Sequence, residues 1–468
     1  MVFNSIFFFI TLLPFLVFYF AGKNRRSATK KVGILIYSYF FYGMWNPSFL
    51  LLIIISTITD YLAARGIVAH PKRKKSFLIA SLVTNLGLLG FFKYYNFFID
   101  TVELFLHSIG IAWSPPLLSI ALPIGISFYT FQTLSYTIDV YRGRISAERN
   151  LLDIAVFVAF FPQLVAGPIV RASQFLPQLT KEPIISQKNI ANGIFMILLG
   201  LFLKDVVADN IAPRVNYLFG NWQSNGIADN WAAGMLFGIQ IYGDFNGYSL
   251  IAIGIAKMLG FEILKNFHAP YAAAGFSDFW RRWHISLSTW LRDYLYISLG
   301  GNRKGTYRTY WNLMITMLLG GLWHGASFMF IFWGGLHGIY LFTQRLLKSY
   351  IHISIEDRII QRLSLALFIV MTYLAVSIAW IPFRAETAEQ GIGMMKGLFC
   401  GDFDLQNSLL SDYIIIMVMF LLHCVSRRYD FFMHVERNSI VRFVSVSIII
   451  FCLYFFSGER TDFIYFQF

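Results

Sequence analysis

Two histidines are suited to acid–base chemistry because both lie in segments where most side chains are apolar. His324 lies in Asn312–Gly338, a segment without a charged side chain, and His284 lies in Phe279–Gly305, where arginines alternate with aromatic residues. An imidazole has an unperturbed pKa of about 6.5, so it takes a proton from a hydroxyl at neutral pH. Two such groups in a membrane cavity fit acyl transfer to a hydroxyl, and they fit proton-coupled transport equally well.

The alternative for His324 is a neutral structural histidine that is hydrogen-bonded to the backbone. Gly320, Gly321 and Gly325 favour a functional site, because small residues let another backbone or a ligand approach closely. His337 follows thirteen positions later, which on an unbroken helix is nearly the opposite face. We therefore expect a structural or secondary role for His337.

The segment Phe279–Leu299 is predicted to form one helix. His284, Ser288 and Arg292 would share one stripe of that helix. A second polar stripe would combine Arg282, Ser286, Thr289 and Asp293. A charge at the centre of a bilayer costs at least ~2.5–3.5 kcal/mol, so two polar stripes indicate a water-filled cavity or a polar bundle interior. The alternative is an interfacial helix whose arginines extend to the lipid headgroups.

The composition predicts an all-α multi-pass membrane protein. Of 468 residues, 57% are hydrophobic and 13% are charged, which is half the charged share of about 25% in soluble domains. Repeated apolar runs predict about ten to twelve transmembrane or re-entrant helices. Pro and Gly are expected to break the helices at Leu122–Phe128 and Phe161–Val170. We expect residues 1–468 to form a single integral-membrane domain.

The net charge of the chain is +13, and the basic residues lie between the apolar runs, as in Lys23–Lys31, His70–Lys75, Gly301–Gly305 and Arg427–Arg428. This distribution is typical of cytoplasmic loops facing anionic lipid, so we expect contact with membrane lipid and none with nucleic acid. The N-terminus and the tail 457–468 are then predicted on the outer face. The sequence contains no known metal-ligand, nucleotide-binding or hydrolase motif, and we predict no bound metal or cofactor.

Six stretches resemble the membrane-bound O-acyltransferase (MBOAT) family, in its bacterial alginate O-acetylase-like branch, which is related to the DltB-type D-alanyl transferases. The stretches are Leu122–Gly143, Gln163–Arg171, Asp244–Phe261, Asn266–Tyr271, Asp278–Gly305 and Gly320–Gly338. The resemblance covers nearly the whole chain. The chain departs from the branch at two positions, with Leu250 where an Asp is expected and Ser298 where a Pro is expected.

The resemblance implies a ring of transmembrane and re-entrant helices around a funnel that spans the membrane. The family's catalytic histidine falls on His324, the expected general base. The second position falls on His284, which would orient substrate or stabilise charge. The implied reaction moves an acyl group, in this branch an acetyl group, from a cytoplasmic thioester to a hydroxyl of an exported polysaccharide. The donor would be acetyl-CoA or an acyl carrier protein.

Four residues are candidates for substrate binding: Arg281, Arg282, Trp323 and Ser288. The two arginines would meet the donor's phosphates, while Trp323 adjoins His324 and Ser288 shares the stripe of His284. The alternative for the arginines is a topology signal, and the same two explanations apply to Arg303 and Lys304.

The resemblance also implies an extracellular or periplasmic SGNH-type acyltransferase partner and a location in the bacterial cytoplasmic membrane. The ending FIYFQF resembles that of glycan-acylating members. Tyr465 in this ending is a possible acyl acceptor, and the alternative is an aromatic anchor at the membrane interface. Two other functions stay open, D-alanyl transfer to teichoic acids and a non-enzymatic transporter of acyl groups or protons.

Overall fold

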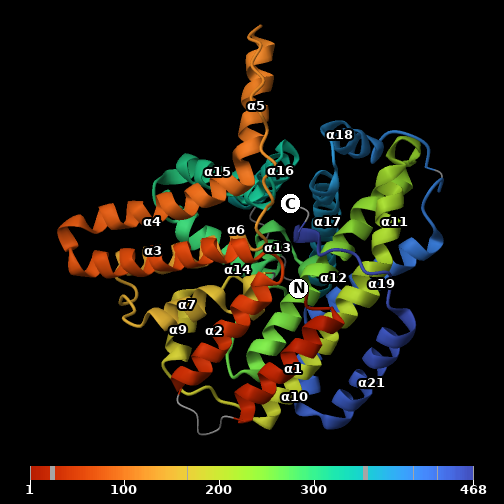
Figure 1. The fold of residues 1–468 in the computed structure, drawn as a ribbon. Coiled ribbons are helices and arrows are strands. Elements are labelled where there is room, and N and C mark those ends of the chain that lie inside the picture. Colours follow the sequence, from red (N-terminus) through yellow and green to blue (C-terminus); the bar gives the residue numbers. More distant parts are fainter. Residues whose placement is uncertain are drawn as a thin grey trace. The chain divides into compact units, whose positions relative to one another are not determined.

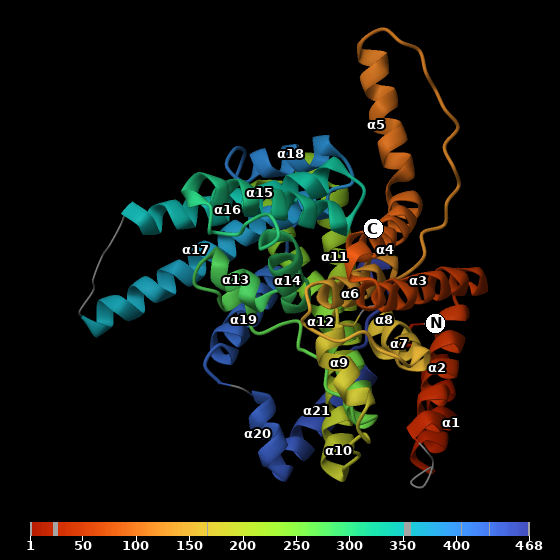
Figure 2. The ribbon, with the colours of Figure 1, turned by 90° about the vertical axis from the view of Figure 1, so that its left-hand side faces the viewer.

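A computed structural model describes residues 2–21, 27–165, 167–350, 357–403, 405–429 and 431–466. Part of the basic segment Lys23–Lys31, and Gln467 and Phe468 of the tail, lie outside these residues. Every regular element within them is helical (Figures 1 and 2). The chain divides into two compact units, one formed by Met1–Ile194 with Ile251–Leu264, and the other by Phe195–Leu250 with Lys265–Phe468. The single domain 1–468 stays a prediction.

The first unit is built around a buried polar cluster. Its helices are α1 (Ile6–Ala21), α2 (Ser27–Gly43), α3 (Leu50–Ala69), α4 (Lys74–Leu89), α5 (Tyr95–Ser108), α6 (Ile126–Tyr141), α7 (Leu151–Ala159), α8 (Phe161–Leu164), α9 (Ala172–Leu179) and the start of α10 (Gln187–Leu201). The carboxylate of Asp60 on α3 accepts hydrogen bonds from Asn85 on α4 at 2.8 Å and Thr137 on α6 at 2.7 Å. Because a buried polar group needs partners, this cluster fixes how the three helices pack.

The two Pro- and Gly-rich stretches break the helices, as predicted. Helix α6 begins only after Gly125, whose φ of +76° lies in the left-handed region, and a Cβ there would collide with the carbonyl oxygen of Leu164. Helix α7 ends at Ala159, and the next helix, α8, has only four residues. Irregular backbone at these points agrees with the sequence, because Pro and Gly cannot continue a stable helix.

The second unit contains the longer C-terminal series of helices. They are the end of α10 with a π-helical turn (Phe202–Ala208), α11 (Asp209–Gly220), α12 (Ile227–Met258, up to Leu250), α13 (Phe276–Arg282), α14 (Ile285–Trp290) with a π-helical turn (Leu291–Tyr296), α15 (Gly305–His324), α16 (Phe328–Tyr350), α17 (Arg358–Arg384), α18 (Ala388–Gly397), α19 (Leu410–Ser426), α20 (Phe431–Arg437), α21 (Ser439–Phe456) and a final 3₁₀ turn (Ile464–Phe466).

Helices α15 and α16 lie side by side in the second unit (Figures 1 and 2). A Cβ at Gly321 on α15 would collide with the carbonyl oxygen of Phe330, and one at Gly334 on α16 would collide with that of Met317. Glycines at both positions therefore allow the two backbones to touch.

The prediction of one helix over Phe279–Leu299 is wrong. Helices α13 and α14 are separate elements (Figure 2). Helix α13 ends at Arg282 and α14 begins at Ile285, and His284 between them has φ +40° and ψ +55°. The backbone here bonds to another segment: the amide of His268 donates to the carbonyl of Arg282 at 3.0 Å, and the amide of Ile285 donates to that of Asn266 at 2.9 Å. These tertiary bonds replace helical ones, and the predicted polar stripes are therefore interrupted.

Five helical stretches within the described residues are long and apolar enough to cross a membrane: Pro47–Ala69, Pro71–Ser108, Gln187–Gly220, Arg358–Arg384 and Ser439–Phe456. Ile6–Ala21 and Leu410–Ser426 are shorter apolar helices. The protein is thus an all-α multi-pass membrane protein, as the composition predicts. The total of ten to twelve segments, the ring and the funnel stay predictions.

Candidate active site

His284 occupies the break between α13 and α14 and is fully buried. A left-handed backbone is unfavourable for a residue with a Cβ, so this conformation is held by the surrounding structure. The hydrogen bonds of the neighbouring Ile285 amide and of the Ser286 hydroxyl to Asn266 supply that restraint. The imidazole packs edge-on against the ring of Phe245 on α12, with centroids 4.6 Å apart.

His324 is the last residue of α15, and it is buried too. The helix ends because Gly325 adopts extended backbone, and a Cβ at Gly325 would collide with the Phe330 ring. The apolar segment Asn312–Gly338 is therefore divided between two helices, α15 and α16, with His324 at the end of the first. Aromatic rings enclose its imidazole, with centroids at 5.0 Å for Trp333 and 5.2 Å for Phe383.

Tyr465 lies beside both histidines in the second unit. Ring centroids are 5.6 Å apart for Tyr465 and His324, 6.5 Å for Tyr465 and His284, and 6.4 Å for the two histidines. The ring of Phe245 lies 4.6 Å from that of Tyr465 and packs against His284 as well. Three segments far apart in the sequence thus bring one phenol and two imidazoles together, a set able to transfer protons to and from a hydroxyl.

The phenol of Tyr465 is a weak acid in this position. Its ring is half-buried and its hydroxyl oxygen is shielded from solvent. Burial, together with the negative charge of Asp244, raises the pKa of this phenol above its ordinary value. The hydroxyl therefore keeps its proton at neutral pH, and any reaction as a nucleophile needs a base nearby.

The structure places the substrate-binding candidates at different distances from this trio. Trp323 lies against both imidazoles, 5.0 Å from the ring of His324 and 5.9 Å from that of His284. The hydroxyl of Ser288 donates to the Trp283 carbonyl at 3.1 Å and so supports the break at His284.

The two arginine candidates differ in their environment. Arg282 is ion-paired with Asp278 at 3.0 Å and also donates to the carbonyl of His268. Arg281, by contrast, is exposed. The substrate-binding roles of Arg281, Arg282, Trp323 and Ser288 stay predictions.

His337 packs in an aromatic cage and is fully buried. Its ring stacks on Phe279 at 5.8 Å, and Trp333 lies 4.8 Å away. The expectation that it faces away from His324 assumed an unbroken helix. Because the chain breaks after His324, both histidines instead contact the same tryptophan, Trp333.

A buried ionic cluster was not singled out from the sequence. Lys204 has no exposed side-chain surface and forms ion pairs with Asp209 at 2.7 Å and Asp244 at 2.9 Å. The C-terminal segment joins it, because Lys204 also donates to the carbonyl of Thr461 at 2.9 Å. The sequence does contain an indication of this cluster, because Lys204 is a charged residue within an apolar segment, and such residues are rare and usually functional.

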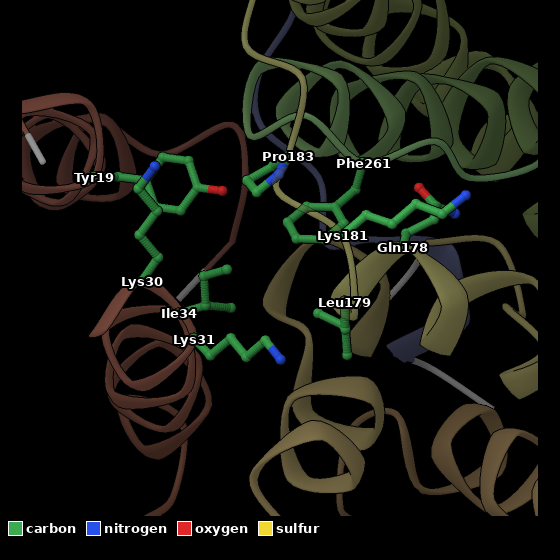
Figure 3. Close-up of a pocket in the computed structure, with 9 residues that line it drawn as sticks. All are labelled: Tyr19, Lys30, Lys31, Ile34, Gln178, Leu179, Lys181, Pro183 and Phe261. Atoms are coloured by element: carbon green, nitrogen blue, oxygen red, sulfur yellow. The ribbon is translucent and has the colours of Figure 1, made fainter. Parts of the chain in front are cut away.

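A separate basic recess lies within the first unit (Figure 3). Lys30, Lys31, Lys181 and Gln178 are among its lining residues. Lys31 is neutralised by Asp153 at 2.7 Å, and the side chain of Gln178 bonds to the backbone. None of the lining residues is a histidine or a carboxylate, so the recess lacks the groups that acyl transfer requires.

Comparison with known protein families gives the class of this all-helical membrane protein. The model of the MBOAT, membrane-bound O-acyltransferase, family matches residues 144–381. The chain belongs to this family, and it is an O-acyltransferase, which confirms the resemblance found in its motifs.

Individual relatives narrow the comparison. The chain is 42% identical over 405 residues to the probable alginate O-acetylase AlgI of Pseudomonas aeruginosa, covering 85% of this chain and 75% of that protein. It is 36% identical over 429 residues to the peptidoglycan O-acetyltransferase of Helicobacter pylori, covering 85% and 80%. A teichoic acid D-alanyltransferase of Bacillus subtilis is 27% identical over 244 residues, which are 48% of this chain and 61% of that protein.

Proposed function

We propose that this O-acyltransferase moves an acetyl group from a cytoplasmic thioester, acetyl-CoA or an acyl carrier protein, to an exported polysaccharide. The observation that carries the proposal is the approach of Tyr465 to His324 and His284. A buried hydroxyl beside two imidazoles provides a nucleophile and the groups that manage its proton. The names of the relatives from Pseudomonas and Helicobacter, an alginate O-acetylase and a peptidoglycan O-acetyltransferase, support acetyl as the group and a polymer as the acceptor.

In the first step, the Tyr465 oxygen attacks the thioester carbonyl while His324 takes the phenol proton. The new C–O bond forms, the C–S bond breaks, and the leaving sulfur receives the proton from His324 to depart as a thiol. His284 stabilises the negative charge on the carbonyl oxygen during the attack.

In the second step, an acceptor hydroxyl attacks the ester on Tyr465 and loses its proton to His324. The ester C–O bond breaks, and the phenolate of Tyr465 takes the proton back. The sum of both steps is a thioester and an alcohol giving an ester and a thiol, with the enzyme unchanged.

The finer features follow from the same proposal. Arg281 and Arg282 meet the donor's phosphates, while Trp323 and Ser288 contact the substrate. The contact of Trp323 with both imidazoles supports its part of this assignment. Tail 457–468 lies on the outer face of the bacterial cytoplasmic membrane, where an SGNH-type acyltransferase accepts the acetyl group.

D-alanyl transfer to teichoic acids is a second candidate, favoured by the likeness to the Bacillus D-alanyltransferase. That likeness covers about half of the chain, whereas the O-acetylase relatives match most of it. Family membership favours an enzyme over a transporter of acyl groups or protons.

The test uses the purified protein in lipid vesicles, supplied with acetyl-CoA labelled in the acetyl group. Peptide mass spectrometry is expected to find one acetyl group on Tyr465 in the absence of an acceptor. Acetyl transfer without any label on Tyr465, together with full activity of Tyr465→Phe, would exclude the tyrosyl ester. If Tyr465 is acylated only by a D-alanyl carrier protein and not by acetyl-CoA, D-alanyl transfer to teichoic acids would be favoured.

A further inference from the structure

The cluster around Lys204 binds the C-terminal segment as well as its own carboxylates. Lys204 Nζ contacts Asp209 at 2.7 Å, Asp244 at 2.9 Å and the Thr461 carbonyl at 2.9 Å. The amide of Ile464 donates to Asp244 at 2.6 Å, and the hydroxyl of Thr461 donates to Asp209. Both carboxylates therefore accept a hydrogen bond from the tail.

The charges explain why the tail belongs in this cluster. One ammonium faces two buried carboxylates, so Lys204 alone leaves an excess of negative charge. A buried carboxylate needs hydrogen-bond donors, and leaving it without them costs several times the net value of one bond. The tail supplies two such donors, from Thr461 and Ile464, and its docking completes the cluster.

Helix α12 links this cluster to the catalytic trio. Asp244 holds the Ile464 amide, and the next residue, Phe245, contacts the rings of both His284 and Tyr465 at 4.6 Å. Tyr248, one helical turn after Asp244, packs on the buried Phe463 ring at 4.3 Å. Contacts with α12 thus hold the tail before Ile464, at Phe463, and after it, at Tyr465.

We propose that Lys204, Asp209 and Asp244 form a clamp that docks residues 461–464 and thereby positions Tyr465 beside His284 and His324. The three clamp residues are positioning residues, since they hold the tail backbone and contact no reacting atom. The proposal rests on the proposed function only for its effect on catalysis. The docking itself is independent of the chemistry at Tyr465.

The test compares four variants of the whole chain in lipid vesicles, among them Lys204→Arg, which keeps the positive charge. Thr461→Val removes one donor to the clamp while keeping the shape of the side chain, and Lys204→Met removes the central cation. Ser457→Ala is the matched control, because its hydroxyl bonds to the Leu453 carbonyl of α21, outside the clamp.

Hydrogen–deuterium exchange of the C-terminal peptide reports docking without any need for activity. Thr461→Val is expected to speed exchange at residues 461–466 by about five- to tenfold, the effect of losing one buried hydrogen bond. Lys204→Met should speed it further, Lys204→Arg should restore part of the protection, and Ser457→Ala should change nothing. Unchanged exchange in Thr461→Val and Lys204→Met would overturn the clamp.

Steady-state kinetics test whether the clamp positions Tyr465. Thr461→Val is expected to lower kcat about five- to tenfold with an unchanged KM for the thioester, because the donor still binds while Tyr465 is misplaced. Faster exchange with an unchanged kcat would overturn the positioning role. Full activity of Tyr465→Phe with faster exchange in Thr461→Val would instead refute the tyrosyl ester and leave the clamp intact, so the two failures are distinguishable.

Discussion

The ring of Tyr465 lies 5.6 Å from the ring of His324, although 141 positions separate them in the sequence. The contact joins a tail segment to the end of α15 and depends on the fold of the whole second unit. A phenol and two imidazoles therefore meet at a point where three chain segments end or break.

Replacing Tyr465 with Phe should reduce acetyl transfer to the polymer to background. The ring keeps its packing on Phe245 and Phe463, so the protein should stay folded while losing only the hydroxyl. Transfer is measured with radiolabelled thioester. Tyr454→Phe, at a tyrosine that is 80% exposed on α21, is the control and should keep full activity. Normal transfer by Tyr465→Phe would refute the covalent role.

Replacing His324 with Ala should lower kcat by about 10²–10⁴-fold, the usual contribution of a general base. His324 is buried among aromatic rings, so folding must be checked by size-exclusion chromatography and circular dichroism. His107→Ala, at an exposed histidine of α5, is the control. Retained transfer by a folded His324→Ala protein would exclude His324 as the base.

Introducing a Cβ between α15 and α16 should separate their backbones. Gly334→Ala places a methyl group against the carbonyl oxygen of Met317, and the expected loss is about 1–3 kcal/mol of stability. Gly335→Ala is the matched control, because its nearest neighbour is a flexible Leu318 side chain at an ordinary 3.5 Å. Thermal unfolding in detergent measures the difference. Equal melting temperatures would contradict the close backbone contact.

Asp278 should contribute stability that depends on pH. Burial alone would raise the pKa of its carboxyl, but the hydrogen bond from the Ala274 amide and the charges of Arg282 and Arg427 outweigh it, so the pKa lies below its ordinary value. Such a group stabilises the fold above about pH 3.9 and loses that effect as pH falls through its folded-state pKa.

The Asp278→Asn variant isolates this contribution. We expect it to be less stable than the parent protein at pH 7 by about 0.5–1 kcal/mol, since the ion pairs are partly exposed. The difference should shrink as the pH falls below about 4. A constant difference in melting temperature between pH 7 and the acid range would contradict the role of this charge.

Sequence reasoning found the residues of the site more readily than their arrangement. His324 stood out because an ionisable side chain in an apolar segment is rare. The left-handed backbone of His284 was missed, since it depends on hydrogen bonds to Asn266 and His268 that no local pattern encodes. Lys204 carried a signal of the same kind as His324. Its partner Asp209 follows five positions later in the same helical stretch, but Asp244 and Thr461 come from separate segments that only the fold brings together.

The helix breaks were likewise predictable where they depend on local sequence and not where they depend on tertiary contacts. The stretch Leu122–Phe128 was predicted to break a helix, and α6 begins only after its Gly125, because glycine and proline act through local backbone energetics. The separation of α15 from α16 at Gly325 was not predicted. A Cβ at that glycine would collide with the ring of Phe330 in the first turn of α16, and the direction of that ring depends on how the chain turns between the two helices.

Because His284 has a positive φ, the backbone at this position should tolerate glycine well, since only glycine adopts this conformation without an energetic cost. A His284→Gly protein would lose its imidazole and gain a hole of the same shape, lined by Phe245 and Trp323. Free imidazole added to the buffer could then bind in this cavity beside Tyr465. On the proposed role of His284, acyl transfer by this protein should then depend on added imidazole.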